Sequence, residues 1–172
     1  MLLEFTVKNF LSFKDEVTLS LRAQKTVTGH EKYNTFLVAG EPILKSVIIY
    51  GANASGKSNL IKALAFMKQF VIGSLERKRE KHREIDIETF KFNTGTINAP
   101  SEFEIVFVYQ DIYYRYGFTL DKKRIHREWL YHAPAEKELK LFERTFEKGT
   151  YTIKLGRTFK EGKLAVDNRA TR

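Results

Sequence analysis

Residues 51–58 read Gly-Ala-Asn-Ala-Ser-Gly-Lys-Ser, with two glycines, a lysine and a serine at the spacing of the Walker A motif. Such a loop must curl until successive backbone N–H groups point at a phosphate, and Gly51 and Gly56 permit the backbone angles that this needs. Lys57 is placed to reach the β- and γ-phosphates of a nucleotide, and Ser58 to give its hydroxyl oxygen to Mg²⁺. The motif therefore predicts a phosphate-binding loop.

The predicted site takes ATP and Mg²⁺ as cofactors, with Lys57 as the catalytic candidate and Ser58 as the magnesium ligand. The predicted cofactor-binding residues are Gly51, Ala52, Asn53, Ala54, Ser55, Gly56, Lys57, Ser58 and Asn59.

The flanking sequence provides the context that a phosphate-binding loop requires, a strand before it and a helix after it. Ser46–Tyr50 is a short apolar, β-branched run, which predicts a strand buried on both faces of a parallel sheet. After the loop, apolar residues recur at helical spacing until Gly73 and Ser74 end the pattern; they are Leu60, Leu64, Met67 and Val71, with Ala63 and Phe70 beside them. The unpaired N–H groups at the start of this helix should face the nucleotide.

Composition narrows the classes of protein that this chain can be. With 172 residues, of which 42% are hydrophobic, it is long enough to bury a core. It has no cysteine, which excludes disulfides and thiolate metal sites, and no run of 18 apolar residues that could span a membrane. The first residues lack the features of a signal peptide, so we expect a cytoplasmic protein without a membrane partner.

The charge of the chain is strongly positive. Lysine and arginine outnumber aspartate and glutamate by 30 to 21, which gives a net charge of +9. Such an excess favours a polyanionic partner, because neutralising phosphates releases counterions. Nucleic acid is therefore a possible partner. Residues 76–84 mix five basic with three acidic side chains, which is typical either of a solvated segment or of an exposed insertion that contacts a partner.

The pattern of the chain divides it into four segments, which together predict an α/β fold (an α+β mixture): a P-loop NTPase lobe with an N-terminal β-hairpin and an antiparallel β-meander. Residues 1–74 comprise an N-terminal β-hairpin over 1–22, a short strand at Phe36–Val38, and the loop with its helix. Residues 75–100 form a charged insertion or linker. Residues 101–157 alternate with a period of two and predict an antiparallel meander, and residues 158–172 form a basic tail.

Two features of the meander invite functional interpretations. Ile105–Asp111 resembles an apolar Walker B strand that ends in a magnesium-binding acid, but Asp111 falls at the tip of a tight antiparallel hairpin, whereas a Walker B strand should be a parallel neighbour of the loop strand. The meander also carries aromatic side chains that could stack on bases, although alternating strands more often pack such residues on one face. These aromatic residues are Tyr109, Tyr113, Tyr114, Tyr116, Phe118 and Trp129.

The order of these motifs resembles that of the ABC-type ATPase heads of the SMC, RecF and OLD class. The resemblance rests on Val7–Phe13 in the hairpin, on Tyr50–Asn59 at the loop, and on the antiparallel lobe that follows. The sequence is most similar to AAA-type ATP-binding proteins of bacterial phage-defence and abortive-infection systems, which share this loop and strands like Arg115–Phe118 and Glu128–Tyr131. The likeness covers nearly the whole chain.

The resemblance implies an ATPase head that dimerises when ATP binds and that controls an effector, such as a nuclease or a toxin subunit. Heads of this class also carry a signature helix, a Walker B Asp-Glu pair and a switch histidine, and we find none of these here. We therefore expect the chain to be one half of the ATPase core, with the C-terminal half in the same or a separate chain, and to be inactive alone. By the same resemblance, the turn at Asn9–Lys14 should lie beside the nucleotide.

Two other functional classes remain open from the sequence. A small P-loop kinase or NTPase would need a substrate lid and its own magnesium carboxylate, and neither can be located. A nucleic-acid-binding module built on the aromatic meander would bind without ATP and with a steep dependence on salt.

Overall fold

The computed structural model describes residues 1–24, 29–73, 84–135, 137–159 and 162. Its main feature is a seven-stranded antiparallel sheet in the order β2-β1-β5-β6-β7-β8-β9. The strands of this sheet are β1 (Leu2–Lys8), β2 (Val17–Ser20), β5 (Ser101–Tyr109), β6 (Ile112–Leu120), β7 (Ile125–Ala133), β8 (Leu139–Glu147) and β9 (Thr150–Leu155). A separate hairpin joins β3 (Thr35–Val38) to β4 (Glu41–Leu44), and the helices are α1 (Glu31–Asn34), α2 (Lys57–Ile72) and α4 (Thr94–Ile97).

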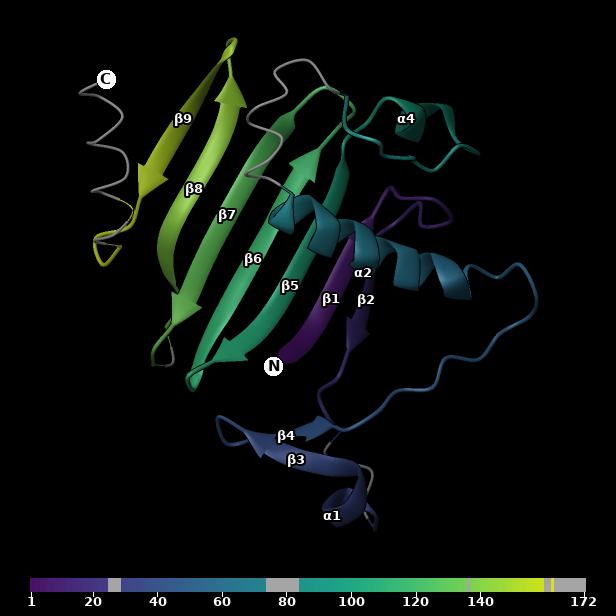
Figure 1. The fold of residues 1–172 in the computed structure, drawn as a ribbon, viewed down its shortest axis with the longest axis vertical. Helices are drawn as coiled ribbons and strands as arrows, with labels where there is room; N and C mark the ends of the chain where they lie inside the picture. The colour runs from purple at the N-terminus through teal and green to yellow at the C-terminus, as the bar shows by residue number, and fades with distance from the viewer. Residues whose placement is uncertain (25–28, 74–83, 136, 160–161, 163–172) are drawn as a thin grey trace.

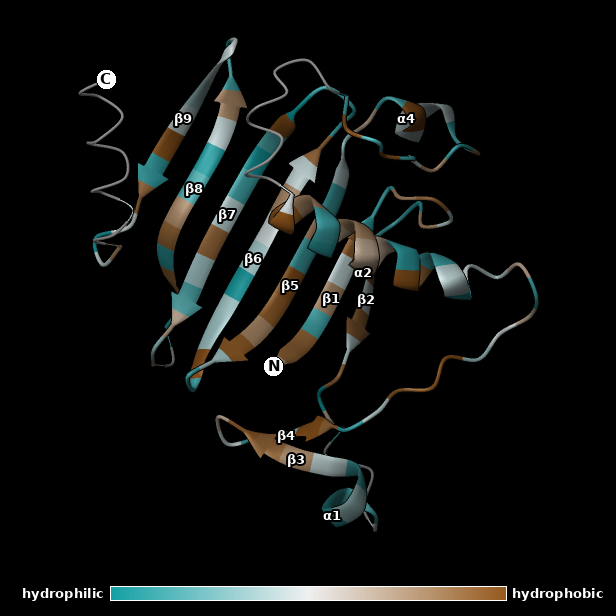
Figure 2. Ribbon diagram, in the orientation of Figure 1, coloured by the Kyte–Doolittle hydropathy of each residue, from teal (hydrophilic) through white to brown (hydrophobic). Residues whose placement is uncertain are grey.

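The core lies between α2 and one face of the sheet, so the chain has two layers (Figure 1). Strand residues alternate between the two faces, and the alternating apolar bands are visible along the strands in Figure 2. Phe5, Phe103 and Phe118 come from three adjacent strands and are fully buried under the helix. The rings of Phe103 and Phe118 lie 5.5 Å apart between centres; Phe103 also lies 5.2 Å from Phe10 in the turn before β2, and Phe118 lies 4.8 Å from Phe70 on α2. This contact fixes the position of α2, and therefore of the loop that leads into it.

The helix predicted after the glycine-rich loop is confirmed. It runs from Lys57 to Ile72 and ends at Gly73, whose N–H donates to the carbonyl of Gln69 at 2.8 Å. The face on the sheet is slightly rotated from the predicted stripe: the buried residues are Leu60, Ala63, Met67 and Phe70, whereas Val71 is exposed. The other face of the helix carries Ile61 and Ile72, which are also exposed.

The predicted strand at Ser46–Tyr50 is not formed, which corrects the expectation from sequence. These residues belong to no strand and are all exposed, with Ile48 at 72% and Tyr50 at 85%. Figure 1 shows the chain between β4 and α2 running outside the sheet to the start of the helix. A parallel strand needs a neighbour to satisfy its backbone N–H and C=O groups, and none of the described residues pairs with this segment.

The opposite face of the sheet is polar and highly paired. Arg115 donates to Glu104 at 2.8 Å and forms two hydrogen bonds with Glu138, and the indole N–H of Trp129 donates to the same Glu104. Gly117 lies beneath the Trp129 ring, where an added Cβ would come within 2.4 Å of the ring. The aromatic residues of the meander therefore divide between both faces. Trp129 and Phe118 are buried, which removes them from any stacking platform.

Most of the other predicted elements are confirmed. The N-terminal hairpin is β1 and β2, the strand at Phe36–Val38 is β3, and residues 101–155 form the antiparallel meander. The charged segment at 76–84 lies outside the described residues except for Glu84, and so does most of the tail at 158–172. In the described part of the chain, no helix has the length and the apolar character needed to cross a membrane.

Candidate functional site

The glycine-rich loop ends at the first turn of α2 in a conformation that leaves backbone donors free of side-chain caps. Gly56 is the N-cap residue of the helix, with a φ of +93°, and no side chain caps this end. Ala54 also lies in the left-handed region, at a φ of +63°. Capping side chains normally satisfy the first N–H groups of a helix, so an uncapped N-terminus can hold an anion instead.

Lys57 is folded back onto its own loop. Its Nζ donates to the carbonyl of Gly51 at 2.8 Å and to that of Ala52 at 2.6 Å. The ammonium group therefore lies inside the curl of the loop, held by two acceptors that a phosphate can replace. Ser58 lies next to it at the start of the helix and is exposed.

A turn of the N-terminal hairpin packs directly on this loop. Phe10 and Phe13 exchange backbone hydrogen bonds of 2.9 and 2.8 Å around Leu11 and Ser12. The amide of Asn59 donates to Ser12 Oγ at 3.0 Å, and a Cβ added to Gly56 would come within 2.5 Å of the same oxygen. Gly56 is thus needed for the close approach of this turn as well as for its positive φ. Phe10 also belongs to the core, so the turn both closes the hairpin and supports the loop.

Asn9, at the start of this turn, anchors it to residues 90–99 through side-chain hydrogen bonds. Its side-chain Nδ2 donates to the carbonyls of Thr96 and Ala99, both at 2.9 Å, and its Oδ1 accepts from the N–H of Phe90 at 3.1 Å. The Oγ of Ser101 donates to the carbonyl oxygen of Asn9. Asn9 is buried and has a φ of +51°, a region that asparagine tolerates better than most residues. One side chain thereby joins the hairpin turn to residues 90–99.

Of the residues singled out from the sequence, the structure brings the loop, the helix start and the Asn9–Lys14 turn together. Asp111 lies in the tight turn between β5 and β6, which pair in antiparallel fashion, and this agrees with its rejection as a Walker B acid. The contact of Ser12 with Gly56 and Asn59 is the detail that the motif alone does not reveal. Among the described residues, no group of three or more histidine, cysteine, aspartate or glutamate side chains could hold a metal ion.

The geometry fits a nucleotide phosphate with its magnesium ion. The uncapped helix start, the inward lysine and the exposed Ser58 hydroxyl are the donors and the ligand that such a group needs. The space inside the curl is bounded by atoms that tolerate little more bulk, since a Cβ on Gly51 would come within 2.7 Å of Ser55 Oγ.

Comparison with known proteins identifies the family of this chain. Residues 46–153 match a family model described as "AAA domain, putative AbiEii toxin, Type IV TA system". A search of curated proteins found no match. The family match covers more than half of the 172 residues and includes the loop, α2 and the strands of the meander as far as β9. The chain therefore belongs to this family of AAA domains, ATPases related to abortive-infection systems.

Proposed function

We propose that this chain is the ATP-binding lobe of an SMC- or OLD-like ATPase head. The family implies nucleotide binding, and the loop at residues 51–59 supplies the backbone donors, the lysine and the hydroxyl that bind phosphate and Mg²⁺. In this proposal Lys57 leaves the carbonyls of Gly51 and Ala52 and turns to the β- and γ-phosphates, while Ser58 holds the metal. Bound Mg²⁺ contributes neutralisation of phosphate charge.

The observation that carries the proposal is the apolar surface on both sides of the loop. Before it, Val47–Tyr50 is exposed and unpaired among the described residues; after it, Ile61 and Ile72 are exposed on the face of α2 that turns away from the sheet. Exposed apolar residues on two adjoining elements are typical of a surface that another part of a fold covers. A second sheet that adds parallel strands beside residues 46–50 would cover both and would enclose α2 between two layers.

That second sheet is the proposed C-terminal half of the ATPase core, in the same or a separate chain. Hydrolysis requires a carboxylate that orients the attacking water. The carboxyl end of a parallel strand next to residues 46–50 would lie near the loop, which is the position such a carboxylate needs. Lys57 and Ser58 bind ground state and transition state alike, so they give affinity more than rate.

The biological role extends this proposal to the complete protein. ATP-driven dimerisation of two heads would change the state of an attached effector, a nuclease or toxin subunit, in nucleic-acid-linked phage defence. The support is the relation of the family to abortive-infection systems. Separation of the ATP-binding lobe from the water-orienting residues suits such a switch, because turnover then depends on assembly.

Binding of ATP to the loop is tested by calorimetry with two lysine variants of α2. Lys57→Ala should lose measurable ATP binding and keep the circular dichroism spectrum, because the hydrogen bonds of its amine to described residues go to exposed loop carbonyls. Lys68→Ala removes an equal charge from an exposed position later on the helix and should bind ATP as the wild type does. Equal affinity in all three proteins would contradict the proposed site.

A further inference from the structure

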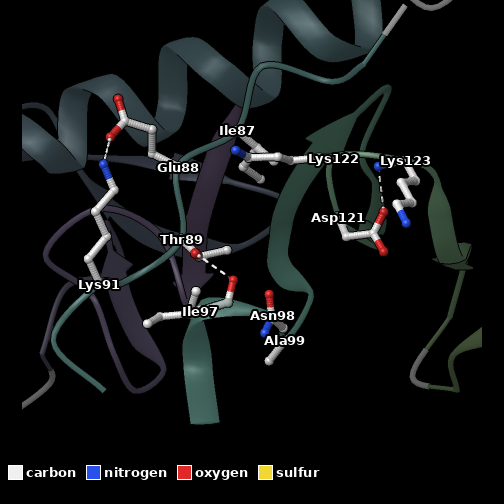
Figure 3. A pocket seen from close by; sticks show the side chains of 10 residues that line it. All are labelled: Ile87, Glu88, Thr89, Lys91, Ile97, Asn98, Ala99, Asp121, Lys122 and Lys123. Atoms are coloured by element: carbon white, nitrogen blue, oxygen red, sulfur yellow. Dashed lines mark hydrogen bonds and ion pairs between the residues drawn. The ribbon is translucent and has the colours of Figure 1, made fainter. Parts of the chain in front are cut away.

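A cavity of about 670 Å³ lies away from the phosphate-binding loop, between residues 87–99 and the turn that joins β6 to β7. Figure 3 shows the side chains that line it, among them Thr89, Lys91, Asn98, Asp121, Lys122 and Lys123. We call it the lysine basin. None of residues 51–59 lines it, so its ligand and the nucleotide on the loop would occupy separate places.

The carboxylates that line the basin already have partners within the chain. Glu88 pairs with Lys91 at 2.7 Å. Asp121 accepts from the N–H groups of Lys123 and Arg124 at 2.7 and 2.9 Å, and its other oxygen lies 2.8 Å from His126 Nε2. Burial alone would raise the pKa of the Asp121 carboxyl, but the hydrogen bonds from His126 and these backbone groups lower it overall. Asp121 therefore shapes the turn and stays ionised.

The two lysines that follow Asp121 in the turn form no such ion pairs with described carboxylates. Lys122 and Lys123 are exposed, and neither amine forms an ion pair with any carboxylate in the described part of the chain. Figure 3 shows Lys122 extending across the basin toward Ile87, while Lys123 extends on the side of Asp121. Lys122 interacts only at longer range with Glu88, whose carboxyl pKa it helps to lower after the larger effect of Lys91. Two exposed lysines at neighbouring positions, neither in an ion pair with a described carboxylate, in a chain of net charge +9, attract a phosphate-bearing ligand.

The opposite wall offers contacts for a base. The Asn98 amide makes no hydrogen bond to any described residue, and asparagine amides pair well with base edges. Phe92 does not line the cavity; it follows Lys91 directly, contacts the Phe90 ring edge-on at 5.8 Å between ring centres, and is 92% exposed, more than any other large hydrophobic side chain described. Water-exposed aromatic rings beside cations are the usual stacking surface of proteins that bind single strands.

Hydrogen bonds within the chain already hold this wall together without a ligand. Thr89 Oγ1 donates to the carbonyl of Ile97 at 3.0 Å, and Thr96 Oγ1 contacts the carbonyls of Phe90 and Asn93 at 2.9 and 2.8 Å. Asn9 holds the same segment from below. A preformed wall lowers the entropy cost of binding.

We infer that the lysine basin binds single-stranded nucleic acid, with backbone phosphates on Lys122 and Lys123, one base on Asn98 inside the cavity and another base stacked on Phe92 outside it. A strand accounts for the exposed aromatic ring outside the cavity as well as for the two lysines, whereas a free mononucleotide would use the cavity alone. The loop at 51–59 does not take part, so the inference does not depend on ATP binding.

The test measures binding of a fluorescent 12-nucleotide single-stranded DNA across a salt series, with Lys57→Ala in every protein and EDTA present to exclude the phosphate-binding loop. Lys122→Glu/Lys123→Glu should lose about 25-fold in affinity at 0.1 M salt and lower the salt slope by about 1.4, the effect of two lost phosphate contacts on a single strand. Lys32→Glu/Lys137→Glu changes the net charge equally at exposed sites away from the basin and should bind as the parent does.

Phe92→Ala separates stacking from charge. It should weaken binding about tenfold and leave the salt slope unchanged, because a ring contributes no charge; Tyr33→Ala, at another exposed aromatic residue, should have no effect. Equal losses in the two lysine pairs would overturn the basin as the site. Displacement of the DNA by AMP as readily as by unlabelled strand would overturn the strand in favour of a free nucleotide.

Discussion

At the scale of single residues, Asn9 links the turn beside the phosphate-binding loop to a distant segment of the chain through side-chain hydrogen bonds. It is separated by more than 80 positions from the residues that it binds, and its side-chain amide forms hydrogen bonds with four backbone groups, one of them at 3.4 Å. These groups are only partly accessible to water, so each one left without a partner costs free energy. The positive φ at Asn9 and at Leu11 adds strain that these bonds must offset.

Asn9→Ala should therefore lower the free energy of unfolding by roughly 2–4 kcal/mol, since it leaves several partly buried backbone donors and acceptors without their partner. Urea denaturation monitored by circular dichroism measures the change. Asn34→Ala, at an exposed position at the end of α1, should change stability by about 0.5 kcal/mol or less. Comparable values for the two variants would show that the amide bonds contribute little.

At the scale of elements, α2 has two apolar faces with different roles. Its inner face packs on the sheet through Met67, which is 3% exposed, while Ile72 on its outer face is 67% exposed. Burial of the inner face against the sheet stabilises the fold of this chain by itself. The outer face adds to stability only when another layer of structure covers it.

Met67→Ala should consequently destabilise the chain by about 2–5 kcal/mol, the usual cost of a cavity in a packed core. Ile72→Ala should stay within about 0.5 kcal/mol of the wild type, because little of its surface is removed from water. Thermal unfolding of both variants measures the difference. A large loss in Ile72→Ala would mean that this face is already covered in the isolated chain.

The elements also show what sequence can predict here. Helix α2 and the meander were predictable because helical spacing and the period of two are local patterns, set by residues a few positions apart. The strand at 46–50 has an equally clear local pattern, yet a strand forms only against a neighbour that the described residues do not provide. The Ser12 contact with Gly56 depends on a turn that brings together residues more than 40 positions apart, which no local pattern encodes.

At the scale of the whole molecule, the arrangement predicts ATP binding without steady turnover. Phosphate release by the purified 172-residue protein should stay at background across a concentration series, although ATP binds. The physical reason is that Lys57 and Ser58 contribute binding affinity for ATP, whereas the carboxylate that orients the attacking water is proposed to come from a second half of the ATPase core. Addition of that half, or expression of a longer product that contains it, should restore turnover.

Steady ATP hydrolysis by this chain alone, lost in Lys57→Ala, would contradict the proposal that this lobe binds ATP while a second half orients the attacking water. Asp111 would then be the first carboxylate to substitute, as Asp111→Asn, because it follows the apolar strand β5. Turnover that appears only at high protein concentration would instead indicate that two copies of this chain complete each other.

The exposed segment at Ser46–Tyr50 has a further consequence for how the protein must be made. Six residues from Ser46 to Gly51 carry no charge and no proline and are rich in β-branched side chains, which is the composition of segments that stack into cross-β aggregates. Natural proteins protect such stretches by pairing or covering them. Synthesis of this lobe without its second half should therefore favour aggregation, and simultaneous production of both halves should raise the soluble yield.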